Sequence, residues 1–173
     1  AAINAKSAQT GVTAQVNATE VGGSAMTAAA SSGKVTINGV DIDVSTTTDA
    51  AASRASVVAA INAKAQQTGV TAIDTGLDSG GVKLVAADGR NVTVKFGSGV
   101  SADTTGLAAA VAGGTTYTGS YTLVSDKDIT IASSNAGNIT NSGLRAGTFS
   151  AQTAYASGVP LTTALGSSII MVI

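Results

Sequence analysis

The clearest pattern in the chain is an alternation of branched aliphatic and polar residues over positions 35–44. It is divided by Asn38-Gly39, a strong hairpin signal because both central residues of a type I′ turn need a positive φ. Side chains alternate along a strand, so the pattern predicts a β-hairpin with one apolar and one polar face. The predicted register pairs Ile37 with Val40 and Val35 with Ile42, places Val44 on the same apolar face, and turns Asp41 and Asp43 to solvent.

A helix is predicted after the hairpin, from about Ala50 to about Gln67. This stretch is rich in Ala, the strongest helix former. The Ser, Thr and Asp residues at 45–49 are candidate N-caps, and Gly69 is a suitable C-terminal stop. An apolar stripe at helical spacing comprises Val57, Val58, Ile61 and Ala65, and we expect Arg54 and Lys64 to lie elsewhere on the helix.

Three strands are predicted next, at about Val70–Asp74, Val82–Ala86 and Asn91–Phe96. Asp88-Gly89 is a tight-turn pair, so we expect it to join the last two strands in a small meander. The predicted fold class is therefore α+β, with small antiparallel sheets and hairpins that are each packed by one amphipathic helix.

Part of this unit occurs twice. Residues 1–15 (AAINAKSAQTGVTAQ, copy 1) match residues 59–73 (AAINAKAQQTGVTAI, copy 2) except at positions 7, 8 and 15. A match this close over fifteen residues indicates a repeated structural unit. We interpret residues 1–34 as the C-terminal part of a first unit, with a helix end at Ala1–Gln9 and a strand at Val12–Asn17, and residues 35–97 as a complete unit.

The remaining sequence is less regular. Residues 98–150 predict a Gly/Ser/Thr-rich linker and a hairpin. The linker includes a helical turn at Leu107–Ala112, the hairpin spans 117–132 around Ser125–Asp128, and residues 133–148 are expected to form a loop. We expect Leu123, Ile129 and Ile131 to face inward. Residues 151–173 form a tail, interpreted either as the first strand of a further unit or as a strand at a sheet edge.

Several segments, in this order, resemble the hook IN motif found in the central variable region of bacterial flagellins and in the flagellar hook-associated cap protein. They are INGVDI at 37–42, AAINA at 59–63, TGVTA at 68–72 and ADGRNVTV at 87–94. Two further segments fit flagellins better, namely YTGSYTLVS at 117–125 with DITI at 128–131, and GLRAGTF at 143–149. Together they cover most of residues 1–150.

Composition narrows the function classes. Apolar residues make up 44% of the chain and are mostly Ala and Val, so the core has to be built from small side chains. Charged residues are only 11% and the net charge is −1, which argues against a nucleic-acid partner. The longest purely apolar run, Ile169–Ile173, is far shorter than the roughly 20 residues of a membrane span. The N-terminal residues do not have the pattern of a signal peptide.

Candidate chemistry is sparse. The chain has no Cys and no His, which removes disulfides, thiolate sites, nucleophilic triads and most zinc sites. The Asp41/Asp43 and Asp126/Asp128 pairs could contribute to Ca²⁺ binding, which needs six or more oxygen ligands. We favour the alternative that these carboxylates are exposed to solvent and bind no metal. No phosphate-binding glycine loop is present. We therefore predict no catalytic, cofactor-binding or metal-binding residues and no cofactor.

Three Asn-x-Thr triplets match the N-glycosylation pattern, which a Thr-rich chain produces by chance. They are Asn17-Ala18-Thr19, Asn91-Val92-Thr93 and Asn138-Ile139-Thr140. Exposed Ser and Thr side chains are better candidates, as acceptors of O-linked glycans, because many flagellins carry such glycans on their outer domains.

The resemblance implies a structural, non-catalytic protein: surface-exposed outer domains of a flagellin subunit in the extracellular flagellar filament. Its implied partners are other flagellin subunits, with no nucleic acid and no membrane. Such subunits pass unfolded through a narrow export channel, which fits the absence of Cys. Long terminal helices carry polymerisation in that family, and this sequence shows none, so we do not expect the chain alone to assemble. The alternatives are a domain of the hook-associated cap protein and an adhesin-like module that binds glycans or a receptor.

Overall fold

A computed structural model of the protein describes residues 2–133 and 144–151. It has an α+β fold of short helices and small antiparallel sheets, as predicted. The described residues form two compact units. Unit 2 is Asn17–Gly119, and unit 1 consists of the described residues up to Val16 and from Ser120 onward. The division therefore assigns one continuous segment to unit 2 and two separate segments to unit 1.

The predicted hairpin is present in unit 2 as β3 (Ser31–Ile37) and β4 (Val40–Thr46). Ile37 pairs with Val40 and Val35 with Ile42, which confirms the predicted register. Asn38 has a φ of 49° and Gly39 a φ of 82°, as a type I′ turn requires. The turn chemistry and the alternation of side chains therefore fix the same register.

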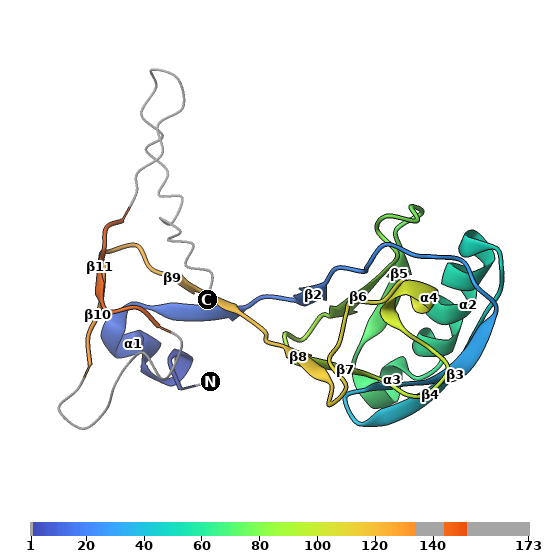
Figure 1. The fold of residues 1–173 in the computed structure, drawn as a ribbon. Coiled ribbons are helices and arrows are strands. Elements are labelled where there is room, and N and C mark those ends of the chain that lie inside the picture. The colour runs from blue at the N-terminus through green and yellow to red at the C-terminus, as the bar shows by residue number, and fades with distance from the viewer. Residues whose placement is uncertain (1, 134–143, 152–173) are drawn as a thin grey trace, which may run out of the picture. The chain divides into compact units, whose positions relative to one another are not determined.

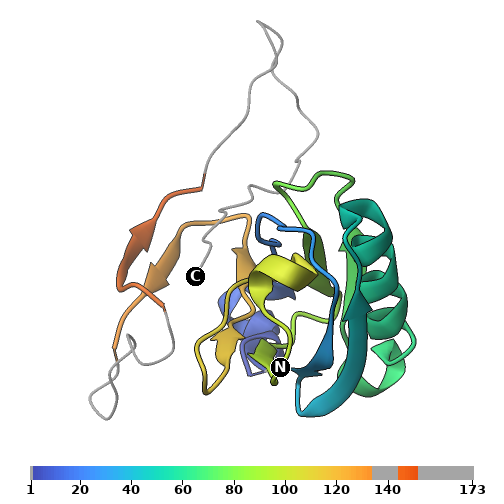
Figure 2. The same ribbon diagram turned by 45° about the vertical axis from the view of Figure 1, so that its right-hand side comes forward.

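Helix α2 (Ala50–Asn62) follows, and Asp49 caps it by accepting a 2.7 Å hydrogen bond from the Ala52 N–H. Figures 1 and 2 show α2 lying alongside the hairpin. The prediction of one helix to Gln67 was wrong in one respect, because the chain leaves helical geometry at Lys64 and resumes it in α3 (Ala65–Thr68). Val57 and Ile61 of the predicted stripe are fully buried.

Two antiparallel sheets complete unit 2. The first has the order β4-β3-β7-β8 and the second the order β2-β6-β5. The additional strands are β2 (Thr19–Val21), β5 (Thr71–Asp74), β6 (Val82–Ala86), β7 (Val92–Phe96) and β8 (Thr115–Tyr117). One continuous core, in which Val, Ile and Leu side chains from both sheets meet α2, holds the unit together.

The predicted meander forms only in its first half, where β5 pairs with β6. β6 and β7 occur close to their predicted positions but do not pair with each other. β6 is flanked by β2 and β5, so both of its edges are occupied, and β7 pairs instead with β3 and β8. The residues around Asp88-Gly89 therefore carry the chain from one sheet to the other.

The linker prediction was also wrong in detail. The helical turn lies at α4 (Ala102–Thr105) and not at Leu107–Ala112. Ser101 accepts a hydrogen bond from the Thr104 N–H, and the Thr104 side chain bonds back to the Ser101 N–H, which forms a capping box. Gly106, with a φ of 70°, then ends the helix.

Unit 1 begins with a 3-10 turn, η1 (Asn4–Lys6), and α1 (Ser7–Thr10). Its four strands are β1 (Thr13–Val16), β9 (Tyr121–Val124), β10 (Ile129–Ile131) and β11 (Gly147–Phe149). The hairpin predicted at 117–132 does not form, because β9 pairs with β1 and β10 pairs with β11. β11 also replaces part of the loop expected at 133–148. Leu123, Ile129 and Ile131 are buried, as predicted. Residues 152–173 of the predicted tail lie outside the described residues.

Copy 1 and copy 2 adopt the same local structure. In copy 2 the Asn62 side chain accepts a 2.8 Å bond from the Ala72 N–H and donates a 3.0 Å bond to the Ala72 carbonyl. In copy 1 Asn4 makes the same pair of bonds to Ala14, at 2.6 and 2.9 Å. Each Asn thus satisfies both main-chain groups of one strand residue, an arrangement that we call the Asn clamp.

Candidate functional site

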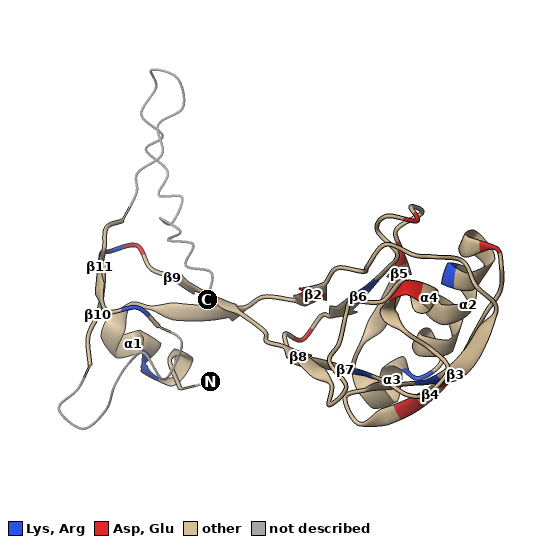
Figure 3. Cartoon of the chain, viewed as in Figure 1, with Lys and Arg blue, Asp and Glu red and all other residues tan. Residues whose placement is uncertain are grey.

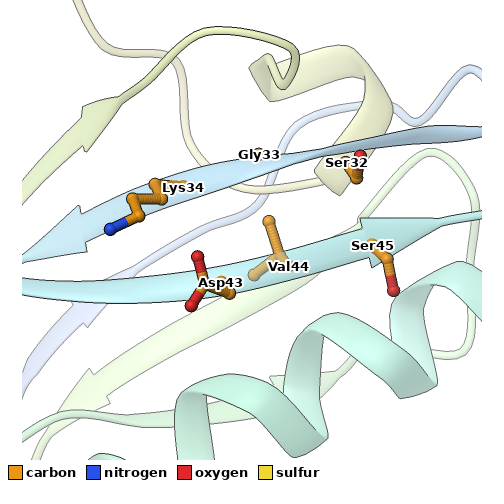
Figure 4. A pocket seen from close by; sticks show the side chains of 6 residues that line it. All are labelled: Ser32, Gly33, Lys34, Asp43, Val44 and Ser45. Atoms are coloured by element: carbon orange, nitrogen blue, oxygen red, sulfur yellow. The ribbon is translucent and has the colours of Figure 1, made fainter.

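The most regular surface feature is the outer face of the β3–β4 hairpin. A shallow depression on it is lined by Ser32, Gly33, Lys34, Asp43, Val44 and Ser45. In Figure 4 the Lys34 and Asp43 side chains extend from adjacent strands, where the two residues are paired across the ladder. The Thr36 hydroxyl donates a 2.8 Å bond to Asp41, and the Lys34 ammonium lies 3.7 Å from that carboxylate. This face is polar, and on it Asp41 is paired with both Lys34 and Thr36.

Neither Asp-x-Asp pair belongs to a cluster of three or more candidate metal ligands among the described residues. Asp41 and Asp43 are exposed on the outer face of β4, and Asp126 and Asp128 are exposed before β10. The Asp128 carboxylate accepts a 2.8 Å bond from the Ala151 N–H. In residues 2–133 and 144–151, no three His, Cys, Asp or Glu side chains are grouped in a way that could hold a metal ion.

The one buried charge that the structure describes in unit 2 is Arg54 on α2, whose side chain is only 5% exposed. The prediction that Arg54 lies away from the packed face of the helix was wrong. Its Nε donates a 2.7 Å bond to Asp74 at the end of β5, and its Nη1 pairs with Asp78 in the following loop. Two carboxylates compensate the buried guanidinium, as a buried charge requires. The cluster therefore joins the helix to β5 and its loop.

The ion-pair cluster of Arg54, Asp74 and Asp78 shifts the pKa values of Arg54 and Asp74. The Gly76 N–H donates a 2.8 Å bond to the Asp74 carboxylate and, together with Arg54, holds the pKa of Asp74 below its ordinary value, although desolvation opposes the shift. The Asp74 bond in turn raises the pKa of Arg54, so Arg54 stays charged. The Arg54 guanidinium therefore stays charged and is paired with two carboxylates of the same unit.

Two of the three Asn-x-Thr triplets lie within the described residues. The Asn91 side chain accepts a 2.9 Å bond from the Gly119 N–H, and the Thr93 hydroxyl lies 2.8 Å from the Thr116 hydroxyl. Thr19 is buried in β2. Asn138 lies outside the described residues. Asn91 and Thr93 therefore serve the fold, while many other Ser and Thr side chains remain exposed.

Charged residues are few and are dispersed along the described chain (Figure 3). Two further ion pairs lie at the surface, Lys83 with Glu20 at 2.6 Å and Arg90 with Asp88 at 2.6 Å. No helix among the described residues is both long enough and apolar enough to cross a membrane. The geometry offers paired surface charges and exposed hydroxyls, which suit a passive, well-hydrated surface.

Sequence reasoning identified the hairpin face but missed two features that hold the unit together, the Asn clamp and the Arg54 cluster. The repeat contained a signal for the clamp, because Asn4 and Asn62 occupy the same position in the two copies. For Arg54, helical spacing from Val57 and Ile61 places it one turn earlier on the same side of the helix. A charged residue at such a position suggests a paired, buried group.

Comparison with known families gives one match. Residues 34–88, about a third of the chain, match the flagellin hook IN motif. The matched segment runs from the middle of β3 through β4, α2, α3 and β5 to just past β6. No curated protein and no solved structure matches the chain significantly.

Proposed function

We propose that the chain forms surface-exposed outer domains of a flagellin subunit. The premise is that the chain is a flagellin-type structural protein, which carries a hook IN motif at residues 34–88. The subunit would belong to the bacterial flagellar filament and thereby serve motility. Its place would be extracellular, and its partners would be other flagellin subunits. The observation that carries the proposal is that the matched residues 34–88 contain most of the buried core of unit 2.

The described surface supports this role. The hairpin turns its apolar side chains into the core and its hydroxyl, ammonium and carboxylate groups to solvent. A domain that faces water along a filament needs such a hydrated outer face, since large exposed apolar patches would cause filaments to associate. The large exposed apolar side chains, Val16, Ile73, Leu77 and Val111, are spread over different strands and loops.

The proposed contribution is mechanical and antigenic. The Arg54 cluster and the Asn62 clamp tie α2 to β5, so the hairpin is presented on a braced support. The exposed hydroxyls of Ser32 and Ser45 are suited to carry O-linked glycans. No reaction is part of the proposal, and the described groups with perturbed pKa values are all accounted for by ion pairs and by hydrogen bonds from the main chain.

Immunogold microscopy tests the proposal. Antibodies raised against the folded protein are applied to intact cells that produce it, with labelling by an antibody to a cytoplasmic protein as the control. We expect gold particles along the whole length of the flagellar filaments. Label confined to filament tips would indicate the cap protein instead, and label on the cell body without filaments would indicate an adhesin-like module. Either result would overturn the proposal.

A further inference from the structure

The duplication extends well beyond the repeated fifteen residues. In unit 2, β5 pairs with β6 so that Ala72 lies opposite Leu84 and Thr71 opposite Val85. In unit 1, β1 pairs with β9 so that Ala14 lies opposite Leu123 and Thr13 opposite Val124. Both partner strands carry Leu-Val at these positions. β9 is therefore the counterpart of β6, although all of unit 2 lies between β1 and β9 in the sequence.

The next pair of strands matches as well. In unit 2, β7 pairs with β8 through Val92 with Tyr117, Thr93 with Thr116 and Val94 with Thr115. In unit 1, β10 pairs with β11 through Ile129 with Phe149, Thr130 with Thr148 and Ile131 with Gly147. The middle Thr hydroxyls face each other in both pairs, at 2.8 Å in unit 2 and 3.4 Å in unit 1. The described part of unit 1 thus repeats α3, β5, β6, β7 and β8.

Burial differs between the counterparts. Ile61, Thr68 and Val70 of copy 2 are fully buried. Their counterparts in copy 1, Ile3 and Val12, are only partly buried, and Thr10 is exposed. These three residues line an open apolar groove in unit 1 together with Leu123, Ile129 and Ile131. The groove is thus built from residues whose counterparts lie under cover in unit 2.

In unit 2, the surface equivalent to this groove is covered by helix α2 and the β3–β4 hairpin. α2 contains Ile61 and carries Val57 beside it in the core, and the hairpin contributes Val35 and Ile37. β3 also pairs with the edge of β7 that faces away from β8. At the turn, the Asn38 side chain donates a 3.0 Å bond to the Thr68 carbonyl and accepts a 2.8 Å bond from the Thr93 N–H.

We propose that the groove of unit 1 is the seat of a β-hairpin and amphipathic helix of the same kind as residues 31–58. The helix of this segment runs on into Ile3 as α2 runs into Ile61, and one strand of its hairpin adds to β10 as β3 adds to β7. The side-chain amide of the Asn in its Asn-Gly turn donates to the Thr10 carbonyl and accepts from the Thr130 N–H. Thr10 and Thr130 are the counterparts of Thr68 and Thr93. This is β-strand addition combined with a helix packed in an apolar groove. The inference does not rest on the proposed function.

The experiment supplies the segment in the same chain. The full protein is extended in front of Ala1 with a second copy of residues 31–58, so that the added helix continues into copy 1 in the register of α2. Amide exchange is then compared with and without the extension. Attachment in the same chain gives the added segment a high effective concentration at the groove. We expect exchange at the Thr130 amide to slow at least about tenfold and a fluorescent apolar probe to lose access to the groove.

A control extension carries Val57→Asp and Ile37→Asp in the added segment, which leaves its length and turn unchanged but places charge on its apolar face. This control is expected to leave Thr130 exchange as in the unextended protein. Exchange at Thr93 provides an internal reference for unit 2. Unchanged Thr130 exchange, equal slowing by the control, or a change at Thr93 in place of Thr130 would overturn the inference.

Discussion

Removing the Asn62 side chain by Asn62→Ala tests how the repeated segment stabilises the fold. β5 is an edge strand of its sheet, with β6 on one side. Asn62 supplies the partner for both main-chain groups of Ala72, a residue that is only 4% exposed. The substitution would therefore leave a donor and an acceptor unpaired at a buried edge.

The expected loss follows from these two hydrogen bonds. Each contributes about 0.5–1.5 kcal/mol net, so their removal costs about 1–3 kcal/mol. Ala is a better helix former than Asn by roughly 0.5 kcal/mol, which offsets a small part of the loss at the end of α2. We therefore expect the free energy of unfolding of unit 2 to fall by about 0.5–2.5 kcal/mol.

Amide exchange in the full-length protein is the appropriate assay, because it reports the two units separately. In Asn62→Ala, the Ala72 amide should exchange faster while the Ala14 amide in unit 1 is unchanged. The matched variant Asn4→Ala should show the reverse, because Asn4 holds Ala14 in the same way. Unchanged exchange at Ala72 in Asn62→Ala, or equal effects of both variants on both amides, would refute the account of the clamp.

Three further outcomes are expected. The fold lowers the pKa of Asp74, so this residue contributes stability that is present above its ordinary pKa of 3.8 and is lost as the pH falls through the lowered value. Asp74→Asn should therefore flatten the acid limb of a plot of unfolding free energy against pH. An unchanged acid limb would contradict this explanation. Gly39→Ala should cost roughly 1–2 kcal/mol in urea unfolding through its positive φ alone, because a Cβ there meets open space; a neutral result would contradict the type I′ turn. Asp49→Ala should cost about 1 kcal/mol through loss of the bond to the Ala52 N–H, with Asp49→Ser as the control that retains a cap.

Local patterns predicted local structure well. The register of the hairpin follows from Asn38-Gly39 and the alternation around it, because turn type and burial both select the same pairing. The positions of β6 and β7 likewise follow from their own residues.

Long-range pairing was not predictable from those patterns. Asp88-Gly89 between two strand sequences is compatible with a hairpin, yet β2 and β5 occupy both edges of β6. The partner of β1 is β9, more than a hundred residues away in the sequence, and nothing local in either strand specifies it. The helical spacing of α2 places Arg54 on the packed side, but the carboxylates that permit its burial, Asp74 and Asp78, lie outside the helix and could not be assigned to it from the sequence.

The central claim is that this chain is part of the protein that builds the filament. Filaments sheared from cells that produce the protein can be purified, digested with trypsin and analysed by mass spectrometry against a digest of the cell bodies. Trypsin cuts after Lys34 and Arg54, so the end of β3, the turn, β4 and the start of α2 are released as the single peptide 35–54. The account predicts that this peptide is abundant in the filament digest, in about equal amount to other peptides of the main filament protein. Its absence from filaments, with recovery from the cell bodies, would contradict the account.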